Sequence, residues 1–439
     1  MNMDIGLITI LMFLFLFIGM ALGVDLAFLL GGIAIIFAIF LWGPHSLGAN
    51  TSIIFKWMTS YSMICIPLFV FMAMVLERAG IADDLYAAIY KWVGHLRGGL
   101  AMGTVGICTL FAAMSGTSGM AVATLGIVAL PSMLKRGYDK QLVVGSIMAG
   151  AALGSLIPPS IIMIVYALFT AVSVGGLFIG GIIPGLLLSA MFIVYIGIRC
   201  ALNPKLGPAL PASEKVSWKD KFASLNAIIL PVLIIVSILG SIFAGIATPT
   251  EASAVGALGA IIAARVNRKL RWGIIKEACI RTFGVTTMII WIIFGASCFA
   301  MVYQGLGATR LLTQLASALE VNRWVILILM QISFFLLGCI LNNMAILMLT
   351  LPVYMPVITT LGFDPLWFGI IYVVNMEMAL LTPPFGFTLF YMKAVVPPEI
   401  SLLDIYKSIV PFVGLQMIGL ILCVIFPALC LWLPRLMIH

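Results

Sequence analysis

Two stretches of this sequence place a pair of prolines inside a long apolar run: LIPPSIIM at Leu156–Met163 and LLTPPFGF at Leu380–Phe387. Proline has no amide hydrogen, and its ring clashes with the carbonyl one turn back, so each pair interrupts a helix and leaves several backbone groups without partners. In a bilayer such groups persist only where protein or a water-filled cavity satisfies them. The two pairs therefore predict two broken helices whose main chain can bind a ligand.

The composition places these runs in a membrane. Of 439 residues, 63% are hydrophobic and 9% are charged, whereas a soluble domain carries roughly 25% charged residues. Apolar runs of about 20 residues recur, and such a run crosses the bilayer core as a helix. We therefore expect an all-α, multi-pass membrane protein surrounded by lipid. The net charge of +8 is interpreted as marking the cytoplasmic face, not a nucleic-acid partner.

Cysteine and histidine show no catalytic or metal-binding pattern. The eight cysteines have no CxxC spacing, and the three histidines are scattered, so we predict neither a zinc site nor a Ser/His/Asp constellation. The N-terminus lacks the basic region of a cleaved signal peptide and is expected to be a helix of the mature protein. We therefore do not expect an enzyme.

The two halves of the chain match each other at an offset of about 226 residues. AMVLERAG at Ala73–Gly80 recurs as AMVYQGLG at Ala300–Gly307, and in both halves an aspartate precedes the proline pair by 19 residues. Because the matches are collinear, we predict a tandem repeat. The first repeat is expected over residues 1–200, a cytoplasmic linker over 201–223 and the second repeat over 224–439.

Each repeat is expected to cross the membrane five times and to contain a re-entrant hairpin and an amphipathic arm helix. The hairpins are predicted at 98–134 and 324–358, and the arms at 81–95 and 308–320. The spans of the first repeat are predicted at 5–22, 24–42, 54–78, 141–170 and 177–199. Those of the second are predicted at 224–247, 251–264, 282–305, 366–395 and 410–432.

An odd number of crossings inverts the second repeat relative to the first, and the charges agree with this. If both termini are periplasmic, 19 of the 23 Lys and Arg residues lie on the cytoplasmic face, as basic residues of membrane proteins do. The four left outside are Lys56, Arg310, Arg323 and Arg435. Inverted repeats with interrupted helices are typical of transporters that bind their substrate near the membrane midplane.

Small polar residues at the two hairpin tips are the first candidate ligands. The first tip is MSGTSGMA at Met114–Ala121, and the second contains Asn342 and Asn343 at the equivalent place. Hydroxyl, amide and carbonyl oxygens suit a small cation such as Na⁺, and the start of the following helix suits a carboxylate. The alternative is that small residues here only let helices pack closely.

Four acidic residues are expected at membrane depth or at its edge. Asp25 and Glu251 are expected to cap helix starts, and Asp364 lies at the edge. Glu377 precedes the second proline pair by six residues, so it either tunes a cation site or hydrogen-bonds Asn375. Ionisable residues within the membrane are functional candidates.

Five motifs carry a resemblance to a known family. They are SGTSGMAVATLG (115–126), LKRGYDKQLVVGSIMAGAALGSLIPPS (134–160), LFIGGIIPGLLL (177–188), ATPTEASAVGALGA (247–260) and GFDPLWFGIIYVVNMEMALLTPPFGFTLF (362–390). Taken in order, they resemble the large, DctM-like membrane subunit of tripartite ATP-independent periplasmic (TRAP) transporters over essentially the whole chain.

The resemblance implies an elevator-type carrier in the bacterial inner membrane that imports an organic acid together with Na⁺. The acid would be a C4-dicarboxylate, sialic acid or another sugar acid. The implied partners are a small four-helix membrane subunit, expected as a separate chain, and a periplasmic substrate-binding protein. One departure from the family is Asn342, which stands where many relatives have an acidic residue and so lowers the negative charge of that tip.

The repeat pattern and the resemblance together define two sets of candidate residues. The predicted sodium-site residues are Ser115, Gly116, Thr117, Ser118, Ser155, Pro158, Asn342, Asn343, Thr382 and Pro383. The predicted substrate contacts are Ser118, Pro159, Ser160, Asn375, Glu377 and Pro384.

Three alternatives stay open at this point. A self-sufficient Na⁺/carboxylate carrier of related elevator fold would show the same repeats and breaks. An intramembrane enzyme would need catalytic side chains that the sequence lacks in the expected cavity. A channel fits less well, because hairpins closed on both sides suit alternating access.

Overall fold

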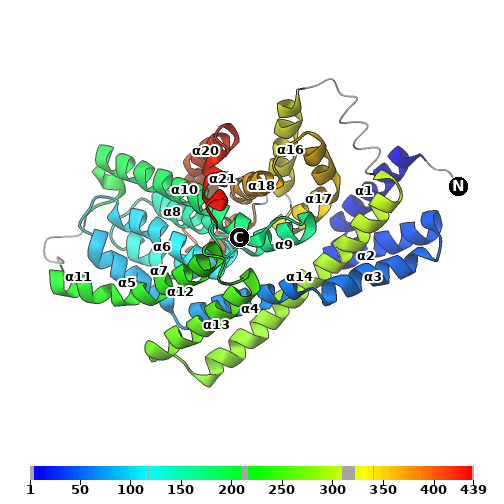
Figure 1. The fold of residues 1–439 in the computed structure, drawn as a ribbon. Helices are drawn as coiled ribbons and strands as arrows, with labels where there is room; N and C mark the ends of the chain where they lie inside the picture. The colour runs from blue at the N-terminus through cyan, green and yellow to red at the C-terminus, as the bar shows by residue number, and fades with distance from the viewer. Residues whose placement is uncertain are drawn as a thin grey trace.

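The computed structural model describes residues 4–116, 118–209, 216–308, 322–339, 341–384 and 386–437, and all regular structure in these ranges is helical (Figure 1). Six of the described helices are long and apolar enough to cross a membrane, which agrees with the expected all-α, multi-pass fold. These are Tyr61–Arg78, Val174–Leu202, Trp218–Phe243, Trp272–Gly305, Asn343–Thr360 and Leu402–Ile425.

One group of helices is built around the 34-residue helix α14, which runs diagonally across Figure 1. It packs along α2 and α4, while α13 packs against α4 and α12. The contact with α2 is close because both helices have glycine there: a Cβ on Gly295 would lie 2.3 Å from the carbonyl oxygen of Ala27. The members of this first group are α1 (Ile5–Ala21), α2 (Leu26–Phe37), α3 (Ser46–Met58), α4 (Cys65–Arg78), α12 (Asn226–Phe243), α13 (Pro249–Val266) and α14 (Trp272–Gly305).

A second group of helices surrounds α8, which packs against α6, α7 and α20. Every residue of α8 from Leu142 to Ala152 is buried, and so is every residue of α18 from Trp367 to Leu380. A helix whose residues are buried on every side lies in the core and turns no face toward the surroundings. This group contains α6 (Gly99–Ser115), α7 (Ser118–Leu134), α8 (Lys140–Ala152), α9 (Ile161–Thr170), α10 (Val174–Leu202), α16 (Arg323–Gly338), α17 (Asn343–Thr360), α18 (Pro365–Leu380), α19 (Phe387–Val395), α20 (Leu402–Ile425) and α21 (Ala428–Arg435).

The order of elements recurs in the two halves. Each half has a helical hairpin (α6–α7, then α16–α17), a broken helix (α8 and α9, then α18 and α19) and a long helix (α10, then α20). The breaks occur at the proline pairs, as predicted: helix resumes at Ile161 in the first half and at Phe387 in the second. Both proline–proline peptide bonds are cis.

The helix α5 (Ile81–Val93) is the first predicted arm, and it contacts both groups. The Lys269 ammonium of the first group lies 2.6 Å from the Asp84 carboxylate of α5. On the other side, the Arg136 guanidinium donates to the Tyr90 hydroxyl at 2.9 Å, and α5 packs along α6. The second predicted arm, 308–320, lies outside the described residues except for its first position.

Helix caps explain where several elements begin. The Asp25 carboxylate accepts the Ala27 amide at the start of α2, and Glu251 forms a capping box with Thr248 at the start of α13. The expected capping roles of these two acids are confirmed. Asp364 likewise caps α18 by accepting the amide of Trp367, which satisfies donors that the helix cannot pair itself.

Three predicted spans have wrong boundaries, and the first of them, 282–305, starts too late because α14 begins at Trp272. The span 54–78 is two helices, because α3 ends at Met58, where Thr59 turns its hydroxyl back onto the Phe55 carbonyl. The span 410–432 begins earlier, at the capping box of Ser401, and ends at Ile425. A separate short helix, α21, follows Pro427, because proline does not continue a helix.

Candidate functional site

A cavity of about 370 Å³ lies where both hairpin tips and the second broken helix approach α14. Its walls come from elements of both halves and of both helix groups. The lining residues are Gly116, Ser118, Gly119, Ser155, Ile161, Ile162, Val285, Met288, Ile289, Ile292, Asn342, Asn343, Met344, Leu380, Phe387, Thr388 and Tyr391.

The first hairpin tip brings oxygen atoms to the end of α8. Gly116 turns the chain with φ of +63°, and a Cβ there would lie 2.8 Å from the carbonyl oxygen of Pro159. The Ser118 hydroxyl lies 3.0 Å from the Ser155 hydroxyl and donates to the Ala152 carbonyl at 3.1 Å. The carboxyl end of a helix carries partial negative charge, so this cluster of oxygens suits a small cation.

The second hairpin tip presents the start of a helix. The Asn342 side-chain oxygen accepts the Ala345 amide at 2.8 Å and so caps α17. The Asn343 carbonyl accepts the Tyr372 hydroxyl at 3.0 Å, which ties the tip to α18. A helix start exposes amide donors and partial positive charge, so this side of the cavity suits an anionic group.

A hydroxyl satisfies one freed carbonyl in each break. The Ser160 hydroxyl donates to the Ser155 carbonyl at 2.5 Å, and the Thr388 hydroxyl donates to the Leu380 carbonyl at 2.6 Å. Both bonds cross a proline pair, and their acceptors Ser155 and Leu380 lie at equivalent positions of the two halves, three residues before the pair. Sequence reasoning missed Thr388, because it follows Pro384 by four residues whereas Ser160 follows Pro159 directly, so the repeat spacing does not pair the two.

The structure brings five of the predicted residues together on the cavity wall: Gly116, Ser118, Ser155, Asn342 and Asn343. Thr117 and the side chain of Ser115 lie outside the described part of the chain. The remaining candidates do not line the cavity, and their binding roles stay predictions; they are Pro158, Pro159, Ser160, Asn375, Glu377, Thr382, Pro383 and Pro384.

Glu377 and Asn375 are buried in α18 but do not bond to each other. The Asn375 amide donates to the backbone and side-chain oxygens of Gln331, at 2.7 and 2.8 Å. Glu377 is 0% exposed, and neither carboxylate oxygen has a hydrogen-bond partner among the described residues. The backbone of Leu156, beside the first proline pair, lies next to this carboxyl group. The expected hydrogen bond between Glu377 and Asn375 is therefore not formed. The other interpretation, that Glu377 tunes a cation site, stays a prediction.

The wall that α14 contributes to the cavity is apolar and was not foreseen. It consists of Val285, Met288, Ile289 and Ile292, which lie on one face of α14. The described residues also hold no group of three or more His, Cys, Asp or Glu side chains placed so that they could bind a metal ion. The oxygen atoms around the cavity therefore come from hydroxyls, amides and main chain, in a setting that is otherwise hydrophobic.

Comparison with known proteins gives the family of this chain. The family model described as "Tripartite ATP-independent periplasmic transporter, DctM component" matches residues 11–429. The chain belongs to the DctM family. It is a multi-pass membrane permease of the TRAP type, which confirms the family predicted from the motifs.

Three DctM-family relatives illustrate the range of named substrates. The C4-dicarboxylate large permease DctM of Pseudomonas aeruginosa is 35% identical over 398 residues, which cover 90% of this chain and 92% of that one. The sialic acid large permease SiaM of Vibrio cholerae is 29% identical and matches 96% of each chain. The isethionate permease DctMQ of Oleidesulfovibrio alaskensis is 29% identical, covering 95% of this chain and 64% of that longer protein.

A solved structure shares the fold of this DctM-family chain. The YdaH transporter of Alcanivorax borkumensis, whose topology is described as unusual, superposes with a TM-score of 0.65 over 89% of this chain and 90% of that one. The two sequences are 14% identical, so the likeness concerns the fold alone. It confirms the predicted fold class of a polytopic, all-helical membrane protein.

Proposed function

We propose that this chain is the large permease subunit of a binding-protein-dependent TRAP transporter that imports an organic acid together with Na⁺. One observation carries the proposal. A single cavity joins the hydroxyl cluster of Ser118 and Ser155, at the carboxyl end of α8, to the amino end of α17. In transporters with broken helices, carbonyl ends coordinate the cation and helix starts face the anionic substrate.

The chemistry of the two ends supports a carboxylate as the cargo. Na⁺ at the first tip would place a positive charge within the same cavity as the α17 start, and both would attract one carboxylate group. The P. aeruginosa relative is named for C4-dicarboxylates and the V. cholerae relative for sialic acid. We therefore propose a C4-dicarboxylate, sialic acid or another sugar acid as the substrate.

The boundary between the two helix groups supports an elevator movement. In this proposal the first group, with α14, is a static scaffold, and the second group carries the binding site past it. The apolar α14 face around Ile289 contributes no polar atom that would hold the cargo. The cargo can therefore move along this face with the hairpin tips while its polar ligands travel with it.

Partners and topology belong to the same proposal. The longer DctMQ relative supports a small membrane subunit as a partner. A periplasmic binding protein delivers the acid, and the complex lies in the bacterial inner membrane. Both termini of this chain are periplasmic, as the positive-inside count indicates.

Reconstitution tests this function. The chain and its small subunit are placed in vesicles with an imposed Na⁺ gradient, and uptake of labelled acids is measured with and without the binding protein. Uptake that needs both supports the proposal. Uptake driven by Na⁺ without a binding protein favours the self-sufficient carrier, and equal uptake without a Na⁺ gradient contradicts the coupling.

The variant Ser118→Ala tests the ion site. Losing one hydroxyl ligand is expected to raise the Na⁺ concentration for half-maximal uptake about fivefold to tenfold. The matched control is Ser146→Ala, because Ser146 is also buried but donates only to the Val143 carbonyl of its own helix, away from the cavity. An unchanged Na⁺ requirement in Ser118→Ala would remove the first tip from the ion site.

A further inference from the structure

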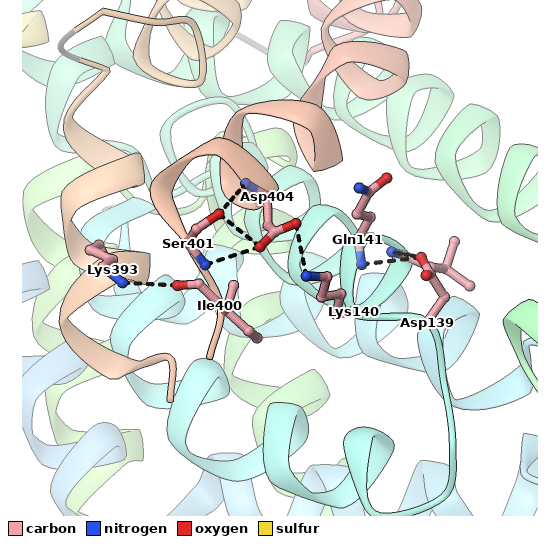
Figure 2. A network of polar contacts seen from close by, with 8 residues as sticks. Asp139, Lys140, Gln141, Lys393, Ile400, Ser401 and Asp404 are labelled. Atoms are coloured by element: carbon pink, nitrogen blue, oxygen red, sulfur yellow. Dashed lines mark hydrogen bonds and ion pairs between the residues drawn. The ribbon is translucent and has the colours of Figure 1, made fainter. Parts of the chain in front are cut away.

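A second pocket of about 280 Å³ lies outside the proposed transport site, between the ends of α8, α10 and α20. These three helices come from both halves of the chain. The lining residues are Asp139, Gln141, Leu142, Tyr195, Arg199, Leu206, Lys407, Ser408, Val410, Pro411 and Phe412. Figure 2 shows part of this end of the molecule, with Asp139 and Gln141 on α8 beside the start of α20.

The acidic groups near this pocket already have partners. The Lys140 ammonium lies 2.9 Å from the Asp404 carboxylate, which also accepts the hydroxyl and amide of Ser401 (Figure 2). One oxygen of Asp139 accepts the amides of Gln141 and Leu142, at 3.1 and 3.0 Å. Asp139 therefore caps α8, and its charge is offset by the helix start.

Two basic side chains of the pocket lack such partners. Arg199 at the end of α10 and Lys407 in the second turn of α20 make no ion pair or side-chain hydrogen bond with any residue that the structure describes. The Arg199 guanidinium lies over the Tyr195 ring, 5.8 Å from its centre, a contact that holds the cation in place. The lining therefore has a net positive charge.

The surroundings of the pocket are strongly apolar. Its own wall residue Val410 is 67% exposed, and Phe412 packs edge-on against Tyr195 at 5.4 Å. On either side, α10 and α20 turn large apolar residues outward, and these are Val194, Ile198, Leu202 and Leu403. In a membrane protein such exposed side chains contact lipid tails, so a basic pocket here sits beside acyl chains.

We propose that this pocket binds the phosphate group of an anionic phospholipid from the cytoplasmic leaflet. Arginine pairs with phosphate oxygens through its planar fork and lysine as a point charge. Basic pockets between membrane helices on the cytoplasmic side bind such headgroups. The assignment to this leaflet rests on the positive-inside orientation, which places Arg199 and Lys407 on the cytoplasmic face.

The position of the pocket suggests a structural role for the bound lipid, namely joining the two halves of the chain. Arg199 belongs to the first half and Lys407 to the second, so one phosphate would join the ends of α10 and α20. The Lys140–Asp404 ion pair joins the two halves close by. The lipid would thus complete a junction between the repeats inside the second helix group, and it would stabilise that group as one body.

Lipid titration of the purified full chain tests the proposal. Phosphatidylglycerol, phosphatidylcholine or soluble glycerol 3-phosphate is added in detergent, and lipid retention and melting temperature are measured. Phosphatidylglycerol is expected to be retained and to raise the melting temperature. The double variant Arg199→Gln, Lys407→Gln is expected to bind it roughly 25-fold more weakly, since each basic residue contributes about fivefold.

The matched control is Lys205→Gln with Arg265→Gln, which removes the same two charge types from exposed positions on the same face outside the pocket. It should bind phosphatidylglycerol as the unmodified chain does, and so should the exchange Arg199→Lys with Lys407→Arg. Three results overturn the proposal: unchanged binding by the double Gln variant, an equal response to phosphatidylcholine, or an equal response to glycerol 3-phosphate.

Discussion

Gly116 shows how one residue positions the candidate site. Its φ of +63° lies in the left-handed region, and the Pro159 carbonyl oxygen occupies the space where a Cβ would stand, at 2.8 Å. The hairpin tip can therefore rest directly on the first proline pair only if this residue has no side chain. That contact sets the place of Ser118 beside Ser155, and with it the cluster of cavity oxygens.

Replacing Gly116 by alanine is expected to damage the site beyond ordinary backbone strain. Alanine at a left-handed position costs about 1–2 kcal/mol, and here it also displaces the tip from Pro159. Gly137→Ala is the matched control, because Gly137 has φ of +77° but nothing within 4 Å of its Cβ position. Both variants should melt earlier. Only Gly116→Ala should also lose Na⁺-dependent uptake, by roughly tenfold, the equivalent of about 1.4 kcal/mol. Equal uptake by both would contradict the role of this contact.

At the scale of elements, the broken helices supply polar groups to the site, and α14 supplies an apolar wall. Each break frees carbonyls, and a hydroxyl across the break, Ser160 or Thr388, satisfies one of them. The breaks therefore stay ordered in an apolar setting, where an unpaired polar group is costly. The helix α14 contributes only apolar side chains to the cavity wall: Val285, Met288, Ile289 and Ile292.

Filling the cavity from α14 should block transport without harming the fold. Met288 lines the cavity yet is 54% exposed, so Met288→Trp adds bulk in front of the hairpin tips at little cost in packing. Uptake is expected to fall roughly tenfold to a hundredfold, about 1.4–2.7 kcal/mol, because the indole ring would occupy space that the cargo needs. Phe283→Trp is the control, because Phe283 is 74% exposed on the same helix outside the cavity. Similar uptake by the two variants in vesicles would remove α14 from the transport path.

At the scale of the whole molecule, the halves meet across the cavity and do not form two separate bodies. The ring of Tyr391 in the second half lies against Gly119 at the first tip, and the Tyr166 hydroxyl of the first half donates to the Pro365 carbonyl of the second. Two halves packed in this way give one cavity whose lining includes the carboxyl end of α8 and the amino end of α17. This arrangement suits an ion and an anion bound together.

The proposed inverted orientation of the halves predicts a pattern of cysteine labelling. Of the eight cysteines only Cys279 is exposed, so Cys279→Ser provides the background. A cysteine replacing Pro208 or Asn267 should react with a membrane-impermeant reagent only from the cytoplasmic side. A cysteine replacing Arg310 should react only from the periplasmic side, because the positive-inside count places that residue outside. Reversal at any one position would break the proposed topology.

Much of the fold was predictable because it depends on residues that are close together in the sequence. The proline pairs predict the breaks between α8 and α9 and between α18 and α19, since a missing amide acts on the residue's own helix turn. The small polar residues that interrupt apolar runs predicted both hairpin tips. The predictions failed at boundaries such as Met58 and Ile425, where single hydroxyls or a proline end a helix inside an apolar run.

The candidate site was predictable only in part. Ser118, Ser155, Asn342 and Asn343 were predicted from the hairpin tips and the first proline pair, and the structure places them on the wall of one cavity. Glu377 was noticed because a charge in an apolar run is conspicuous, yet its environment follows from packing: Asn375 bonds Gln331 and leaves Glu377 without a partner among the described residues. Hydrophobic patterning alone does not distinguish such arrangements, because every neighbour is an apolar helix.

Local chemistry in the chain was enough to predict a membrane permease with two interrupted helices and polar hairpin tips. Helix breaking, hydropathy and repeat spacing depend on residues near each other in sequence, so they can be read without coordinates. The apolar wall of α14, the hydroxyl of Thr388 across its break and the basic pocket of Arg199 and Lys407 depend on contacts between distant segments. Those contacts form when buried helices pack against one another. Which helices pack together depends on the shape and packing of their whole surfaces.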